Sequence, residues 1–160
     1  MITRSFLVLT LALAACSSPD PLARGDVRDL DRTWFEIRAG VRDGDAARIQ
    51  AVAAPTADAE IGLRVLLLLT ATDDGRAIRE TLLRSDVGAL EPHTGAVPSQ
   101  PDVQGQILTF EASQRTPAAD GFPASDSGLT LFIQLDGDNA HLLETLAWSR
   151  IVRDDSGSPE

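Results

Sequence analysis

The single cysteine of this chain, Cys16, is the feature that most constrains how the chain can fold. One thiol cannot form a disulfide within the chain, so the fold has to be stabilised by packing alone, even in an oxidising compartment. The composition permits this, because 43% of the residues are hydrophobic and 24% are charged, as in ordinary globular proteins. A chain of 160 residues is expected to form one domain around one hydrophobic core.

The cysteine also ends a segment that has the form of an export signal. A short basic start with Arg4 precedes an apolar run from Phe6 to Ala15, interrupted only by Thr10. This run is too short for a transmembrane span, which needs about 20 residues, but it suits the apolar region of a signal peptide. We therefore expect residues 1–15 to be removed rather than folded.

The residues Leu13, Ala14, Ala15 and Cys16 resemble the lipobox of bacterial lipoproteins, in which an aliphatic residue and two small residues precede the acceptor cysteine. This resemblance implies that the thiol of Cys16 receives diacylglycerol, that the signal is cut just before it, and that the new amine is acylated with a fatty acid such as palmitate. Ser17 stands where many lipoproteins retained at the inner membrane have Asp. The resemblance therefore implies delivery to the outer membrane.

Ordinary secretion is the alternative interpretation of the same segment. Ala12, Leu13 and Ala14 also fit a small-x-small cleavage site, which would release a chain that begins at Ala15 and carries a free thiol. A lone cysteine at the lipidation position favours the anchored form. Residues 16–25 contain two prolines and small polar residues, and we expect them to form a tether of at most about 35 Å.

Residues 26–152 are expected to form a single α+β domain, in which N-terminal helices pack on a small antiparallel sheet, with a disordered tail at 153–160. Apolar residues recur at spacings of three and four from Val27 to Val41, which predicts a helix with Asp26 as its N-cap and Trp34 in the core. A second helix, Ala46 to Val52, is predicted with Asp45 as its N-cap.

Two central segments allow more than one secondary structure. Ile61 to Thr70 is the most apolar stretch after the signal. Its Gly62 and the Asp-Asp-Gly string at 73–75 favour a buried strand followed by a turn. A core helix is the alternative. Arg76 to Arg84 has charged residues four apart and predicts a surface helix. The alternative for residues 76–84 is a strand that pairs with residues 61–70.

The C-terminal half has the alternating pattern of a sheet. Ile107 to Ala112 and Leu129 to Leu135 predict two strands that pair antiparallel, and residues 87–106 and 116–128 are expected to be loops. Residues 140–152 fit a helix or a strand. A strand is favoured, because the Asp- and Gly-rich turn before it is typical of a hairpin and because two strands alone are marginally stable.

The strings RDGDAARI at 42–49 and LDGDNA at 135–140 resemble parts of the nuclear-transport-factor-like cone fold, in which a bent sheet wraps helices around a pocket. This chain has fewer predicted strands than that fold. The resemblance implies a small-molecule pocket between the first helix and the last strands, and it transfers no site residues.

No pattern in the sequence predicts a catalytic centre, a cofactor site or a metal site. His93 and His141 are the only histidines, and neither lies in a nucleophile motif or at a metal-ligand spacing. The acidic string that begins at Asp136 resembles a calcium loop, but it lacks the required Gly at its sixth position and Glu at its twelfth. The chain contains no lysine and no tyrosine, which excludes the chemistry of those side chains.

The net charge of −10 excludes nucleic acid as a favourable partner, because an acidic surface repels the phosphate backbone. The leading expectation is a lipid-anchored periplasmic protein that, without catalysis, binds or supports another envelope protein. A small-molecule-binding domain of the cone type is the alternative. A hydrolase that uses His93 or His141 is the least favoured.

The anchor can be tested by Cys16→Ser. Because the side chain of serine cannot form the thioether, we expect the variant to lose the acyl chains and to move from the detergent phase to the aqueous phase in Triton X-114 partitioning. Mass spectrometry of the wild-type mature chain is expected to show diacylglycerol on residue 16, and Ser17→Ala serves as the control that keeps the anchor. An unmodified Cys16, or Ala15 still attached to it, would contradict the lipobox interpretation.

Overall fold

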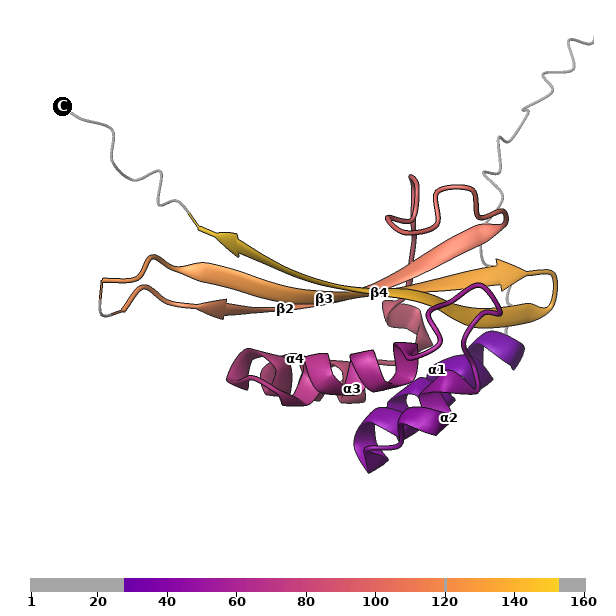
Figure 1. Cartoon of the computed structure of the whole chain (residues 1–160), viewed down its shortest axis with the longest axis horizontal. Helices are drawn as coiled ribbons and strands as arrows, with labels where there is room; N and C mark the ends of the chain where they lie inside the picture. Colours follow the sequence, from indigo (N-terminus) through magenta and orange to yellow (C-terminus); the bar gives the residue numbers. More distant parts are fainter. Residues whose placement is uncertain (1–27, 120, 153–160) are drawn as a thin grey trace, which may run out of the picture.

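The computed structural model describes residues 28–119 and 121–152. The expected signal, Cys16, the tether, the Asp26 cap and the C-terminal tail lie outside these residues. Four α-helices come first, and four strands follow (Figure 1). The helices are α1 (Arg28–Asp43), α2 (Ala46–Gln50), α3 (Ile61–Thr70) and α4 (Asp73–Arg84), followed by a short 3-10 turn at Val87–Ala89. The strands are β1 (Glu91–Pro92), β2 (Gln106–Thr116), β3 (Ser125–Asp136) and β4 (Asn139–Ile151).

The strands form one antiparallel sheet in the order β1-β2-β3-β4, and the helices lie against one of its faces (Figure 1). Leu129, Leu131 and Ile133 of β3 are buried in the cluster that contains the helical core residues, and Leu135 packs against it, as their alternation predicts. The α+β class is confirmed. The helical layer also contains α3, for which a strand was favoured from the sequence.

The segment after the β3–β4 turn is a strand, as favoured from the sequence. A bulge explains why its pattern was ambiguous: Phe132 pairs with Glu144 and Ile133 pairs with Leu142, so Leu143 is an extra residue in β4. Residues 142–145 are therefore all buried, and the alternation of sides is lost over this stretch. Gly137, with φ at 57°, supplies the left-handed conformation at the turn.

The first helix packs its predicted apolar stripe against the sheet. Trp34 is 2% exposed and its ring centroid lies 5.2 Å from that of Phe110, so its predicted place in the core is confirmed. The start of the helix is fastened to β4, because the Ala140 amide donates to Asp29 Oδ2 (2.9 Å) and Thr33 Oγ1 donates to the Ala140 carbonyl (2.8 Å). The N-terminal end of the domain thus lies beside the β3–β4 turn.

The second helix begins as predicted and ends two residues earlier, at Gln50. The Arg48 amide donates to Asp45 Oδ1 (3.1 Å), which is the expected N-cap. The Arg48 guanidinium binds the Glu36 carboxylate of α1, and this hydrogen bond lowers the pKa of Glu36. These contacts join the first two helices.

The prediction of a strand at Ile61–Thr70 was wrong, and the alternative helix is correct. Ile61, Val65 and Leu69 recur four apart and fill the core, and leucine is a strong helix former. The Asp-Asp-Gly string at 73–75 is the first turn of α4, because Thr72 Oγ1 caps that helix by accepting from the Gly75 amide (2.9 Å). The predicted helix at Arg76–Arg84 is confirmed as part of α4.

The strands β2 and β3 are longer than predicted, and both ends of the expected loop at 116–128 belong to strands. Pairing continues to Thr116 opposite Ser125. The added residues are mostly polar because this part of the hairpin extends beyond the helices, so no buried face imposes an apolar pattern (Figure 1). The loop at residues 93–105 covers the opposite sheet face near the other end, where Val97 packs with Ile107, Phe132 and Leu143.

Gly62 makes the contact between α2 and α3, and its substitution tests the helical layer. A Cβ added there would lie 2.2 Å from the Ala46 carbonyl oxygen. We therefore expect Gly62→Ala to lower the free energy of unfolding by about 1–3 kcal/mol, although alanine is the better helix former. Urea denaturation measures the change. The control, Thr81→Ala on the exposed face of α4, is expected to change it by less than about 0.5 kcal/mol, and a stabilised Gly62→Ala would contradict the packing described.

Candidate docking surface

The strand β4 is an edge strand, and only its first half is covered by its own chain. The Leu142 amide donates to Val52 and the Ala54 amide donates to the Leu142 carbonyl, both at 2.8 Å. Gln100 Nε2 donates to the Leu143 carbonyl (3.2 Å). Within the described ranges, residues 145–151 pair with β3 alone. Thr145 is buried, whereas residues 146–151 are exposed or half-buried. The outer backbone groups of residues 146–151 are therefore open to another strand, as at any unprotected sheet edge.

The indole of Trp148 packs across the neighbouring strand rather than over the open edge. A Cβ on Gly128 would lie 2.2 Å from Trp148 Cζ2, so the ring occupies the space left by the missing side chain. Its Nε1 donates to Thr130 Oγ1 (3.3 Å), and the Arg150 guanidinium carbon lies 5.6 Å from the ring centroid. The ring stabilises the end of the sheet and leaves the outer edge of β4 accessible.

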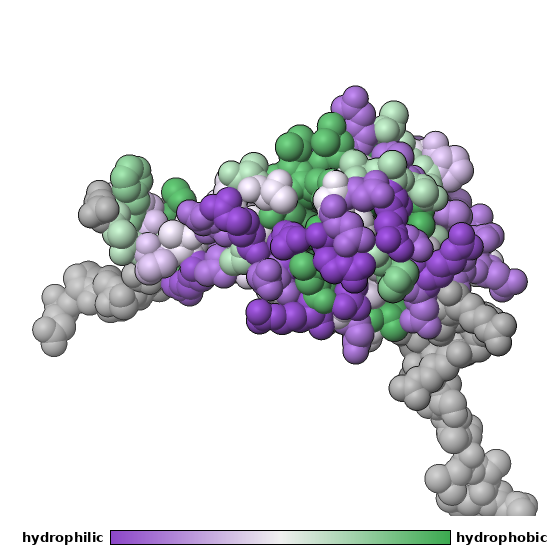
Figure 2. Space-filling model, turned by 90° about the horizontal axis from the view of Figure 1, so that it is seen from below, coloured by the Kyte–Doolittle hydropathy of each residue, from purple (hydrophilic) through white to green (hydrophobic). Residues whose placement is uncertain are grey.

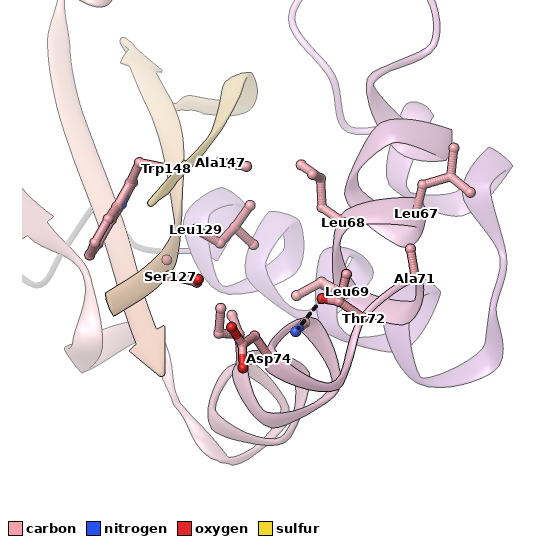
Figure 3. Close-up of a pocket in the computed structure, with 13 residues that line it drawn as sticks. Leu67, Leu68, Leu69, Ala71, Thr72, Asp74, Ser127, Leu129, Ala147 and Trp148 are labelled. Atoms are coloured by element: carbon pink, nitrogen blue, oxygen red, sulfur yellow. Dashed lines mark hydrogen bonds between the residues drawn. The ribbon is translucent and has the colours of Figure 1, made fainter. Parts of the chain in front are cut away.

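A groove of about 350 Å³ lies between this part of the sheet, the end of α3 and the start of α4. Leu68 and Leu69 from α3 point towards Leu129 of the sheet, whereas Leu67 points away from it (Figure 3). Of the polar residues that line the groove, Thr72 is used in the helix cap and Asp74 accepts a hydrogen bond from Thr116 (3.1 Å). The groove is therefore mainly apolar.

The outer face of α3 adds an exposed apolar area beside the groove. Leu63 is 47% exposed and Leu67 is 55% exposed, although other aliphatic residues of the same helix fill the core. Apolar side chains stand out among hydrophilic ones when the helical side is viewed (Figure 2). A helix that is apolar on nearly all sides is normally buried. We call the open edge 146–151, the groove and the outer face of α3 together the docking surface.

A smaller cavity of about 160 Å³ lies at the covered half of β4. Glu144 is buried there, and both of its carboxylate oxygens accept hydrogen bonds from Ser99, from the amide at 3.0 Å and from the hydroxyl at 2.7 Å. The Thr145 hydroxyl is buried without a partner. The Ser99–Glu144 pair holds the loop on the sheet, and among the described residues no histidine or second carboxylate hydrogen-bonds to it.

The two histidines are not brought into a catalytic arrangement. His93 follows β1, and its ring lies edge-on to Phe132 with centroids 5.2 Å apart. His141 pairs with Gln134 across the sheet. In residues 28–119 and 121–152, His93 Nε2 is buried without a hydrogen-bond partner. The same residues contain no group of three or more His, Cys, Asp or Glu placed to hold a metal ion, and none of their helices is long and apolar enough to cross a bilayer.

Comparison with known proteins adds no family to this description. No family model matches the chain, and no curated protein or solved structure matches it. The site therefore has to be interpreted from its own geometry.

The sequence analysis did not identify the docking surface. The four consecutive leucines at 66–69 carried the signal, because only some of them can face the core of an amphipathic helix. Because this segment was interpreted as a buried strand, the leucines that cannot face the core were not recognised as exposed. The open half of β4 could not be found from sequence, because it depends on where the chain segments at Val52–Ala54 and Gln100 end.

The contact of Trp148 with Gly128 can be tested by fluorescence quenching with acrylamide. Gly128→Ala is expected to displace the indole, break its bond to Thr130 and increase quenching of Trp148. Trp34 is buried, so the Trp148→Phe variant supplies the protected reference signal. Ser127→Ala, one residue away and on the helical side, is the matched control. Equal quenching in Gly128→Ala and wild type would contradict this packing.

Proposed function

We propose that this chain is a lipid-anchored protein at the periplasmic face of the bacterial outer membrane, and that it acts without catalysis by holding a polypeptide of the envelope. The lipobox-like segment ending at Cys16 supports the anchor. The docking surface supports the holding role, and it is the observation on which the proposal rests.

Three properties of the docking surface favour a polypeptide as its occupant. The open edge at 146–151 offers backbone donors and acceptors that another strand can satisfy. The exposed leucines of α3 lie on the same element that lines the groove, so one partner can cover both. An acyl anchor needs no apolar protein surface to hold the membrane, which leaves these leucines without a role in anchoring.

A small apolar molecule is a second candidate occupant, and the volume of the groove favours it. Ligand pockets start at about 300 Å³, which is close to the 350 Å³ found here. Such a site also needs polar groups to orient the ligand. Thr72 and Asp74 already have partners within the chain, which leaves the Ser127 hydroxyl to orient such a ligand. Because the open strand edge beside the groove suits a polypeptide and not a small apolar molecule, polypeptide docking is the better supported of the two.

The role can be tested by photo-crosslinking in intact envelopes. A benzophenone amino acid in place of Leu67 is expected to give discrete crosslinked products of higher mass. The same amino acid in place of Phe35 is the matched control, because Phe35 is 56% exposed and lies on α1.

Three outcomes separate the candidates. Crosslinks from position 67 alone support docking at this surface. A crosslinked product with the mass of one chain plus a small ligand would support the small molecule as the occupant. Equal background at positions 35 and 67 would contradict the proposed function.

A further inference from the structure

We propose that the loop between β1 and β2 is a strap that opens as a unit from the sheet while the helical layer stays packed. The strap comprises residues 95–105 and lies on the sheet face opposite the helices (Figure 1). This inference goes beyond the proposed function, because it concerns a movement of the chain itself and needs no occupant of the docking surface.

The strap crosses the sheet from one edge to the other. It begins two residues after His93, whose amide donates to the Ile107 carbonyl (2.8 Å) at the β1 side of β2. At the β4 edge, Ser99 is hydrogen-bonded to the Glu144 carboxylate, and Gln100 Nε2 donates to a β4 carbonyl. The strap then returns to the start of β2.

Val97 is the one buried residue of the strap, and it closes a small apolar cluster. It packs with Ala54, Ile107, Phe132 and Leu143, which are separate from the main cluster between the sheet and the helices. Burial of this side chain makes the closed strap the resting form. Opening withdraws one side chain from the small cluster and leaves the main cluster intact, so it requires much less free energy than unfolding the domain.

The strap is fastened to a buried carboxylate that lacks an oppositely charged partner. Glu144 is 8% exposed, and its two oxygens accept from the amide and the hydroxyl of Ser99. In the part of the chain that the structure describes, no basic side chain forms an ion pair with it, and Arg64, which lines the same cavity, pairs with Asp58 instead. A buried charge without a counter-ion is costly. The contact that holds the strap closed therefore also carries a cost that opening removes.

Two buried polar atoms beside the strap have no hydrogen-bond partner. His93 Nε2 lies at one end, 3.8 Å from the place that a Cβ on Gly95 would take. Thr145 Oγ1 lies at the other, where Thr145 and Ser99 line the same cavity. The remaining two such side-chain atoms in residues 28–119 and 121–152 belong to α1. Opening the strap admits water to the first two, which recovers the cost of leaving them unpaired.

A glycine at each end of the strap can serve as its hinge. Gly95 has φ at 132° and Gly105 has φ at 105°, conformations that other residues rarely adopt. Hinges are a few residues at the ends of elements that absorb large changes in φ and ψ. Because β1 and β2 remain paired outside these two positions, the strap can swing away without disturbing the sheet.

Opening would change what the sheet exposes. Phe132 and Leu143 are 3% and 1% exposed beneath the closed strap and would be uncovered. The Leu143 carbonyl would lose its bond from Gln100, whereas Leu142 would stay covered by the segment at Val52–Ala54. The strap therefore limits how much of β4 is accessible.

The first experiment detects opening with a thiol in residues 16–160 carrying Cys16→Ser, which contain no other cysteine. Val97→Cys on the strap and Val65→Cys in α3 replace valines that are 2% and 0% exposed. Each rate of reaction with DTNB in native buffer is divided by the rate in denaturant. The thiol at position 97 is expected to react at least about tenfold faster than the thiol at position 65. Equal rates would overturn the proposal, because both thiols would then need the same global unfolding.

The second experiment leaves Val97 in place and follows the Ser99 amide by hydrogen exchange. Its bond to Glu144 breaks when the strap opens, whereas the Leu142 amide is bonded to Val52 outside the strap. We expect Ser99 to exchange at least about tenfold faster than Leu142, after correction for intrinsic rates. Exchange of Ser99 as slow as that of Leu142 would overturn the proposal.

The same measurement tests the cost of the unpaired hydroxyl. Thr145→Val keeps the shape of the side chain and removes the hydroxyl, so it is expected to slow exchange of the Ser99 amide about fivefold. The control, Thr81→Val on the exposed face of α4, is expected to change it by less than about twofold. Equal exchange in wild type and Thr145→Val would overturn the proposal. Such a result would leave the proposed function intact, because position 67 is not part of the strap.

Discussion

The burial of β3 on both faces is the constraint on which the rest of the structure depends. Its residues 128–133 are all buried, with Leu131 and Ile133 against the helices and Phe132 under the loop that carries Val97. Hydrogen bonds to β2 on one side and β4 on the other fix its place. A chain without an internal disulfide obtains its stability from such a centre, and the sheet edges are correspondingly less protected.

The helical layer depends on close contacts at two glycines. A Cβ on Gly62 would meet the Ala46 carbonyl oxygen, and one on Gly75 would lie 2.3 Å from the Leu68 carbonyl oxygen. These contacts bring α2, α3 and α4 together as one layer.

Sequence reasoning succeeded where one periodicity applied throughout an element, and it failed where neighbours determined the outcome. The stripe of α1, the Asp45 cap and the alternation in β3 were predicted because each follows from local geometry. The helix at Ile61–Thr70 was misassigned because glycine and an Asp-Asp-Gly string are typical of turns, whereas here they serve helix contact and capping. The open edge was not predictable, since it is defined by segments distant in sequence.

The fastening of α1 to Ala140 determines how mechanical force would enter the domain. The chain reaches the domain at Asp29, whose carboxylate and the nearby Thr33 hydroxyl bind the first residues of β4. A pull on that end would load α1 and the start of β4 together, because these two hydrogen bonds join them. The helix could not be drawn away from the sheet without separating it from the first residues of the edge strand.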